Sequence, residues 1–595
     1  MDSGSAPPVS SASMDDRGEP FKSFRELSKA RGGTPPPAPV PEGDEPDGES
    51  VGVPGEAFPE REGGGARERI ARRPPAFGAM QHGPACYRTT ESEEMQLLAS
   101  FRLRTFFPAD VRAEVERLPR DPDPADFAGR WDLRGELVYT IDGEDARDYD
   151  DAISIRDLGQ GAVEVGVHIA DVAHYVRPGT ALDDEALARA TSVYVADQVL
   201  PMLPEELSNH LCSLVGGRDR LAYSVLMTFD ARGKRTAARV GKSVIRSARR
   251  NNYREVQELL DRADTPGARA VAFLETSLRL FERWTKKQQE LRDARGSMRL
   301  SSVERKFVFD ERHDVAAVVD APRYFSQALI EETALAANQA VGDLFRARGL
   351  PAIYRVHPEK DPQEVEQVAR GLEEHGIHVP KKDRLTGRDI ARLIQAARRK
   401  TNAEALIQRI MGLIERAVYE VHDHEDVATH FGLARQAYLH FTSPIRRYPD
   451  LIVHRWLWAV ESRPDQAACE LRAEEFLADL NDVASHCSLQ AELAEMAERS
   501  MEDLKVCQYL EPHVGLKLDA LVLRVSPYGL EVRLTRFNVT AFLPARVLGE
   551  RARVQGPHLT IQAGKRSLSF SEGHPIHVRI QDVDFVKLQV LLELG

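Results

Sequence analysis

The sequence predicts an α+β protein in which a large domain of mixed strands and helices precedes a small all-β barrel. The chain has 595 residues, of which 42% are hydrophobic and 29% charged, enough to build a large core and more than one domain. Strand-like and helix-like patterns alternate through the central region, whereas short strands punctuated by Gly and Pro follow Pro512. No repeat of fixed period occurs, which excludes a solenoid.

The first 90 residues have too few apolar side chains to predict a hydrophobic core. Residues 1–90 are rich in Pro, Gly, Ser and Glu, and they lack the apolar surface that would offset the entropy of ordering. We therefore expect a disordered tail. Residues 91–130 predict a short helical segment, because Leu97, Leu98, Phe101, Val111 and Val115 recur at helical spacing.

The main domain is predicted over 131–511 as a mixed sheet surrounded by helices. Residues 162–169 and 222–230 alternate apolar and polar side chains, as half-buried strands do. Longer stretches with helical periodicity lie at about 270–294, 324–348, 402–421, 447–460 and 468–510. From 512 to 595, strand-like runs predict a small barrel of the OB type: 516–525, 529–537, 539–548, 559–564, 574–584 and 587–594.

The amino-acid composition says more about the cellular compartment of the protein than about what it binds. The net charge of −13 gives only a weak argument against nucleic-acid binding, because charge acts per face of a protein. The five cysteines are scattered without a CxxC pair, which disfavours a zinc site or disulfide framework and favours a reducing compartment. With no signal pattern and no run of about 18 apolar residues, we expect a cytoplasmic protein with no membrane segment.

Residues 140–155, TIDGEDARDYDDAISI, hold six acidic side chains between two apolar strand-like runs. Such carboxylates repel one another and titrate together unless cations lie among them. Asp148 and Asp150 share a face of an extended segment, Asp151 points away unless the chain bends, and Asp142 closes the group from the preceding strand. Glu144 and Asp145 are expected to be loop or salt-bridge residues.

A carboxylate group of this kind suits Mg²⁺, or Mn²⁺, which take oxygen ligands. Two such ions about 4 Å apart can activate water and stabilise both oxygens of a phosphoryl displacement. A helix-loop-helix calcium site beginning at Asp142 would require Gly at 147 and Glu at 153, and the chain has Arg147 and Ile153. The calcium interpretation is therefore excluded.

Three further patterns offer substrate contacts. In 438–455, YLHFTSPIRRYPDLIVHR, two prolines bracket a turn that presents Arg446 and Arg447 before a helix; they could bind phosphate or cap that helix. In the helical segment 329–338, LIEETALAAN, Glu331 shares a face with Asn338, which fits a sugar contact or a buried pair. Candidate rings for base stacking are Tyr194 and Tyr253, although core packing is the commoner role of a tyrosine.

Together the motifs resemble the ribonuclease II / ribonuclease R family, whose catalytic RNB domain carries a TIDGEDARDxDDA segment. The similarity continues, in the same order, through VHIADVAHYV, VLPMLPEELSNHLCSL, IEETALAAN, PAIYRVHPEKDP and HFTSPIRRYPDLIVHR, over roughly 125–510. The C-terminal strands resemble the S1 RNA-binding domain that follows the RNB domain in this family. Family members usually place two cold-shock domains in front, whereas only about 45 residues that we expect to be ordered precede Asp142 here. We therefore expect a different RNA entrance.

The resemblance implies a 3′-to-5′ exoribonuclease that hydrolyses single-stranded RNA to nucleoside 5′-monophosphates. We expect it to use the Mg²⁺ that the carboxylates suit and to act as a monomer. The resemblance also implies that Asp142, Asp148, Asp150 and Asp151 bind the metal, with Asp150 and Asp148 catalytic. Arg446 would stabilise the scissile phosphate, and Tyr194 would stack on the 3′-terminal base. Glu331 or Glu332 would contact the 3′-terminal nucleotide, with Tyr253 and Arg447 as further substrate contacts. The alternatives are a catalytically silent RNA-binding protein on the same scaffold and a hydrolase of other phosphodiesters.

Overall fold

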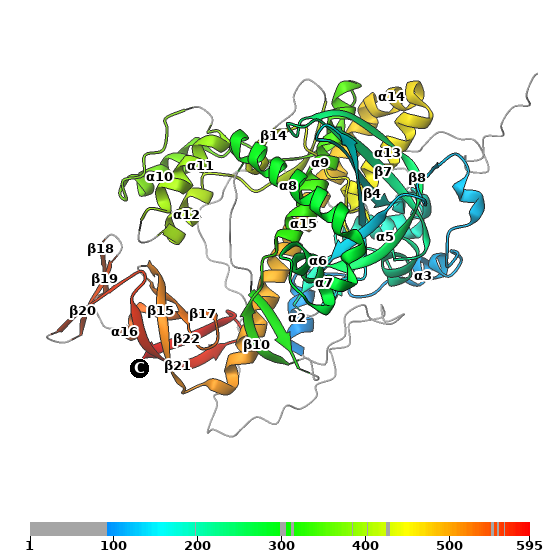
Figure 1. Cartoon of the computed structure of the whole chain (residues 1–595). Helices are drawn as coiled ribbons and strands as arrows, with labels where there is room; N and C mark the ends of the chain where they lie inside the picture. The colour runs from blue at the N-terminus through cyan, green and yellow to red at the C-terminus, as the bar shows by residue number, and fades with distance from the viewer. Residues whose placement is uncertain are drawn as a thin grey trace, which may run out of the picture.

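The structure is a computed structural model that describes residues 92–595 except for short gaps (Figure 1). The gaps are 197, 298–304, 311–313, 383–384, 401–402, 424–428, 527, 549–551, 556–557 and 564–565. The tail predicted over 1–90 lies outside the described residues. Two helices, α2 (Ser92–Ser100) and α3 (Ala109–Val115), confirm the helical start of the ordered chain.

One six-stranded sheet forms the centre of the main domain. Its order is β1 (Trp131–Asp132), β8 (Arg235–Asn252), β2 (Val138–Asp142), β3 (Asp151–Gly159), β4 (Ala162–Ala170) and β7 (Asp219–Phe229). The strands β4 and β7 confirm the two alternating segments. The basic strand β8 was not predicted; it pairs with β7 along its first part and with β2 at its end, which closes the sheet.

Each face of the sheet is buried against helices, as Figure 1 shows for α8, α9 and α13. In β2, Tyr139 and Ile141 join one hydrophobic cluster, together with residues of α8 (Glu275–Arg295) and α9 (Phe325–Ala347). The alternate residue Val138 joins the opposite cluster, with α5 (Ala181–Arg189) and α13 (Tyr448–Ser462). The helices predicted over about 270–294, 324–348 and 447–460 are thus confirmed.

Two predicted helices were wrong in extent. The helix expected over 402–421 ends as α12 (Ala403–Met411), and the β-favouring residues that follow form β12 (Val418–His422), which pairs with β11 (Ala352–Val356). The helix expected over 468–510 is divided at Ala473, whose ψ of 131° is extended, into α14 (Pro464–Arg472) and α15 (Glu474–Leu510). No helix in the described ranges is long and apolar enough to cross a bilayer.

The C-terminal strands close into the predicted barrel, ordered β15 (Lys517–Ser526), β16 (Gly529–Leu534), β17 (Val539–Pro544), β22 (Gln589–Leu594) and β21 (Pro575–Asp584). The run at 559–564 was wrongly counted among the barrel strands. It forms β19 (His558–Ala563) of a separate sheet with β18 (Ala552–Gln555) and β20 (Arg566–Ser571), while α16 (Ala545–Leu548) ends the third predicted strand. Residues Val506, Cys507 and Leu510 of α15 complete the barrel core.

The smaller elements connect these parts. They are α4 (Val172–Tyr175), β5 (Val193–Val195), β6 (Gln198–Leu200), α6 (Tyr253–Leu260), α7 (Pro266–Ala270), β9 (Arg305–Phe309), β10 (Val315–Asp320), α10 (Pro362–Glu373), α11 (Gly387–Ala397), β13 (Thr429–His430) and β14 (Arg435–Gln436). Helices α10, α11 and α12 share a separate small core and stand to one side of the six-stranded sheet in Figure 1.

The sheet buries a histidine whose titration should make the fold acid-sensitive. His168 of β4 lies between the hydroxyls of Ser154, at 3.0 Å, and Ser224, at 2.7 Å, and burial lowers its pKa from 6.5 to about 3. Because the folded-state pKa lies below the unfolded-state value, its stabilising contribution is complete above about pH 6.5 and is lost as the pH falls.

We expect the free energy of unfolding to fall by about 2 kcal/mol between pH 6.5 and about pH 5 through His168 alone. Urea titrations of the wild type and of His168→Gln at both pH values measure this contribution. The variant should have the shallower pH dependence by that amount. Equal pH dependence in the two proteins would show that His168 does not titrate in this way.

Candidate active site

The acidic segment forms the connection between two neighbouring strands. The strand β2 ends at Asp142 and β3 begins at Asp151, so these two carboxylates stand at adjoining strand ends. Arg250 of β8 holds the intervening loop, because its Nη2 donates to the carbonyl oxygens of Gly143 (2.6 Å) and Glu144 (2.5 Å). The arrangement fixes the start and the end of the cluster relative to the sheet.

Glu144 and Asp145, the two acidic residues of the segment that were not expected to bind metal, each form an ion pair with a basic side chain. Glu144 Oε1 lies 2.8 Å from Arg254 Nη2, and Asp145 Oδ2 lies 3.4 Å from Lys306 Nζ. Both are exposed. The prediction that Glu144 and Asp145 are loop or salt-bridge residues is confirmed.

The acidic segment and the arginine segment meet at Asp150. Its Oδ1 accepts a hydrogen bond of 2.9 Å from the backbone N–H of Ile445, 295 positions away, and its Oδ2 lies 3.7 Å from Arg446 Nε. Asp150 is only 4% exposed, whereas the Arg446 side chain is 43% exposed. The structure therefore places a buried carboxylate behind a guanidinium that solvent can reach.

The turn that carries Arg446 is held from three sides. Asp450 Oδ1 accepts from the Ser443 N–H and from Arg447 Nη2, both at 2.8 Å. The Arg446 carbonyl accepts from the Ser192 N–H at 3.0 Å, which ties the turn to the segment before β5. Because the backbone is fixed at both ends of the turn, the Arg446 side chain has a defined origin.

Burial and mutual repulsion make the carboxylates hard to ionise. Burial, followed by the charge of Asp151, raises the pKa of Asp142 to about 8, and burial raises the pKa of Asp151 to about 6. Burial also raises the pKa of Asp148, and that of Asp150 far above its usual range. The Arg446 guanidinium opposes the shift at Asp148, Asp150 and Asp151, so its charge acts on most of the cluster.

Both candidate stacking tyrosines lie at the cluster. Tyr194 of β5 is 41% exposed, and its hydroxyl lies beside Asp148 and Arg446, with which it interacts. Tyr253, the first residue of α6, is half-buried, and the charges of Asp151 and Asp142 add to burial in raising its pKa. The structure thus brings together the four aspartates, Arg446 and both rings.

The helical motif on α9 separates its two glutamates. Glu332 is buried and Glu331 is exposed, and Arg292 Nη1 of α8 lies 3.2 Å from Glu332 Oε1 and 2.6 Å from Glu331 Oε1. Asn338 donates to the Tyr438 hydroxyl and accepts from the Phe441 N–H, both at 2.9 Å. The predicted buried pair of Glu331 with Asn338 is therefore wrong, because Asn338 is buried with other partners and Glu331 pairs with Arg292 at the surface. Glu331 is the glutamate that a substrate can reach.

Comparison with known proteins decides the family. Residues 130–463 match the RNB domain, which is more than half of the chain. The chain belongs to the ribonuclease II / ribonuclease R family. Ribonuclease R from Thermotoga maritima is 37% identical over 448 residues, which are 75% of this chain and 62% of that protein. The chain also spans 59% of ribonuclease R 1 from Lactococcus lactis, to which it is 31% identical, so it covers about three fifths of these relatives.

Solved structures of the family share the fold. RNase R from Mycoplasma genitalium, in complex with ribose-methylated single-stranded RNA, superposes with a TM-score of 0.73 at 24% identity, covering 85% of this chain and 78% of that one. Yeast Ssd1, described as a pseudonuclease, superposes with a TM-score of 0.60 at 18% identity and covers 80% and 58% of the two chains. A fold that occurs in both proteins does not itself establish activity.

The RNB family implies a divalent metal, and the donor set here fits one. All four candidate ligands are carboxylates, the donors that hard cations prefer. Asp142 Oδ2 and Asp150 Oδ2 are buried without a hydrogen-bond partner among the described residues, although Asp150 Oδ2 lies 3.7 Å from Arg446 Nε. Both oxygens therefore have lone pairs that a cation could use. Within the same ranges, no three His, Cys, Asp or Glu side chains stand close enough together to surround one ion, so the fit rests on the kind of donor and on these two oxygens and not on a preformed coordination shell.

Three residues that support the RNB site escaped the sequence analysis. Arg250 anchors the acidic loop, Arg292 pairs with the α9 glutamates, and Asp450 holds the turn before Arg446. Arg250 and Arg292 lie in stretches rich in charged residues, so no local signal distinguishes them. Asp450 could have been found, because a carboxylate in the first turn of α13 is positioned to accept backbone N–H groups upstream.

Proposed function

We propose that this RNB-family protein is a 3′-to-5′ exoribonuclease that hydrolyses single-stranded RNA to nucleoside 5′-monophosphates with divalent metal ions. The observation that carries the proposal is the junction of Asp150 with the Arg446 turn, which combines a buried carboxylate and an accessible guanidinium. The relatives named ribonuclease R and the RNase R structures bound to single-stranded and double-stranded RNA support it.

The proposed roles follow from position and charge. Mg²⁺ or Mn²⁺ would be held by Asp142, Asp148, Asp150 and Asp151. The ion would bring positive charge to the phosphate and would lower the pKa of a water molecule that serves as the nucleophile. Asp150 and Asp148 also orient the nucleophile at the reacting phosphate. Arg446 contacts the non-bridging oxygens of that phosphate and offsets the negative charge that grows in the transition state.

The remaining candidates bind the 3′ end of the RNA. Tyr194 would stack on the terminal base, and this role is supported by the position of its hydroxyl beside Asp148 and Arg446. Glu331 would accept a hydrogen bond from a ribose hydroxyl, the group that distinguishes RNA from DNA. Tyr253 and Arg447 are further proposed contacts. The monomeric state and cytoplasmic location remain predictions.

The silent alternative would be expected to lack part of this set. A protein that only binds RNA has no need of four acidic side chains and an accessible arginine at one centre. Here Asp142, Asp148, Asp150, Asp151 and Arg446 are all present and, apart from the solvent-accessible guanidinium, at least half-buried. This observation favours the catalytic proposal over the silent one.

A cleavage assay tests the proposal. Single-stranded RNA and DNA of one sequence, labelled at the 5′ end, are incubated with the protein and Mg²⁺ or a chelator. The expected result is a ladder of RNA products shortened one nucleotide at a time, which the chelator abolishes, with DNA left intact. Binding of RNA without cleavage under all metal conditions would reject the proposal in favour of the silent alternative.

The barrel should contribute RNA affinity through Tyr528, which lies between β15 and β16 and is 81% exposed. Loss of one stacked base costs about 1–3 kcal/mol, so we expect Tyr528→Ala to weaken RNA binding by roughly 5- to 150-fold. Fluorescence anisotropy with labelled RNA measures this, and the cleavage rate at saturating RNA should not change. Val586→Ala, at another exposed residue of the barrel, is the control; an equal loss there would assign the effect to the barrel surface in general.

A further inference from the structure

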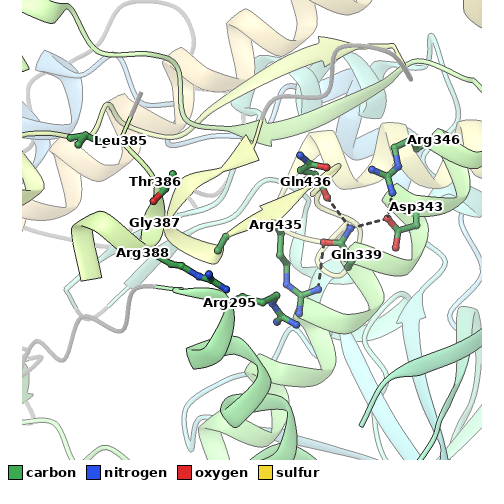
Figure 2. A pocket seen from close by; sticks show the side chains of 11 residues that line it. Arg295, Gln339, Asp343, Arg346, Leu385, Thr386, Gly387, Arg388, Arg435 and Gln436 are labelled. Atoms are coloured by element: carbon green, nitrogen blue, oxygen red, sulfur yellow. Dashed lines mark hydrogen bonds and ion pairs between the residues drawn. The ribbon is translucent and has the colours of Figure 1, made fainter. Parts of the chain in front are cut away.

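A cavity of about 770 Å³ opens on the main domain between the end of α8, the helix α9, the start of α11 and the strand β14. Its lining includes four arginines, Arg295, Arg346, Arg388 and Arg435, together with Gln339 and Asp343. Figure 2 shows Arg435 and Arg295 extending toward one another from different elements, with Arg388 reaching toward them. None of these arginines belongs to the proposed catalytic site.

The single carboxylate of the group, Asp343, is already engaged. It forms ion pairs with Arg235 and, at 3.7 Å, with Arg346, and its Oδ1 accepts from Gln339 Nε2 at 3.0 Å. The negative charge of Asp343 is therefore already paired with Arg235 and Arg346 at one end of the cavity. It does not balance the other three arginines.

Those three arginines have no ion pair to a carboxylate within the described part of the chain. Arg388 donates to the carbonyl oxygen of Ala294 at 3.1 Å, and Arg435 donates to Gln339 Oε1 at 3.4 Å. Both acceptors are neutral. The cavity thus concentrates three positive charges whose hydrogen-bond acceptors here are neutral. The one carboxylate that acts electrostatically on Arg295 and Arg435 is the buried Glu332, which is itself paired with Arg292, so the excess of positive charge favours an anion.

Burial of two of these arginines strengthens the preference of the cavity for an anion. Arg435 Nε is a buried atom without a hydrogen-bond partner among the described residues. Burial, and then the charge of Arg295, lower the pKa of Arg435 to about 10, and burial also lowers the pKa of Arg295. Guanidiniums that are desolvated beside one another are unfavourable unless an anion is bound between them.

We propose that this arginine cavity is a second anion site, which binds a phosphate group. A guanidinium presents parallel N–H donors that match two phosphate oxygens, and three of them from separate elements can surround a tetrahedral anion. Glu332 of α9 acts on the charges of both Arg295 and Arg435, so the cavity adjoins the α9 glutamates. The segment from Arg435 continues directly to the Arg446 turn.

Two sources can supply that phosphate, and both follow from the proposed function. One is the backbone of an RNA strand whose 3′ end lies in the active site. The other is the nucleoside monophosphate that the reaction releases. Phosphate binding itself does not depend on the proposed activity, so the two proposals can fail separately.

Binding measurements on the full chain separate the sources. The probes are adenosine 5′-monophosphate, followed by calorimetry, and a labelled single-stranded RNA, followed by anisotropy on the Asp150→Asn background to prevent cleavage. The variants are Arg435→Gln and Arg295→Gln. The control is Arg370→Gln, an exposed arginine of α10 that pairs with Glu366 outside the cavity.

We expect each cavity variant to weaken binding of at least one probe by about tenfold or more, because a charge-assisted contact is lost. A loss confined to the mononucleotide assigns the site to product. A loss confined to RNA, with a salt dependence reduced by about 0.7 per contact, assigns it to the strand backbone. The control should match the parent protein. Unchanged affinity for both probes in both variants would overturn the inference.

Thermal unfolding separates binding from a structural role. Without ligand, Arg435→Gln should melt at the same temperature as the parent protein or higher, because it removes like-charge repulsion. Adding the monophosphate should raise the melting temperature of the parent more than that of the variant if product binds there. A variant that melts well below the parent while keeping its affinity would show that Arg435 serves the fold instead.

Discussion

Replacement of Asp150 by Asn is expected to slow RNA hydrolysis by a factor of about 10³ or more, the largest effect of any single change in this protein. The amide oxygen of Asn can still accept the Ile445 N–H, so the junction with the arginine turn survives. What disappears is the negative charge that would bind the metal and orient the nucleophile. Single-turnover cleavage of 5′-labelled RNA at saturating protein measures the change.

The matched control is Asp145→Asn, in the same loop but paired with Lys306 at the surface. Its rate should stay close to that of the wild type. RNA affinity should also change little in Asp150→Asn, because the carboxylate lies behind Arg446. Equal losses of rate in the two variants would mean that the loop, and not the buried carboxylate, determines activity.

Replacement of Arg446 by Gln should lower kcat by about 10²- to 10³-fold, because removing one donor that stabilises transition-state charge costs about that much. Arg446→Lys should recover part of the loss, since it restores charge but not the two-pronged contact. Steady-state assays with Mg²⁺ held at saturation separate kcat from KM. If Arg446→Gln raised only KM, the arginine would be a binding residue and its assigned role in the transition state would be wrong.

The acidic segment could be predicted from sequence because its ligands are local. Asp142 through Asp151 occupy one strand-to-strand connection, so residue type and spacing suffice. The Arg446 turn was also predictable, since two prolines define it. Their meeting through Asp150 and Ile445 could not be derived from the residues alone, because it depends on how helices and strands between them pack.

The elements that the sequence did not predict correctly also depend on contacts between distant parts of the chain. The strand β8 carries so many basic residues that its alternation is hidden, yet pairing with β7 and β2 satisfies its backbone. Residues 412–421 continue a helical apolar pattern, but β12 gains its partner only from the distant strand β11. The arginine cavity brings α8, α9, α11 and β14 together, so no single stretch of the sequence reveals it.

The identity of the product tests the central claim most directly. RNA is degraded in water enriched in oxygen-18, and the released nucleotides are analysed by mass spectrometry for the wild type and for Asp150→Asn. We predict nucleoside 5′-monophosphates that each carry one heavy oxygen on phosphorus, formed at a rate that collapses in the variant. Nucleoside diphosphates, 3′-phosphates or an undiminished rate in Asp150→Asn would contradict hydrolysis at the site that joins Asp150 to Arg446.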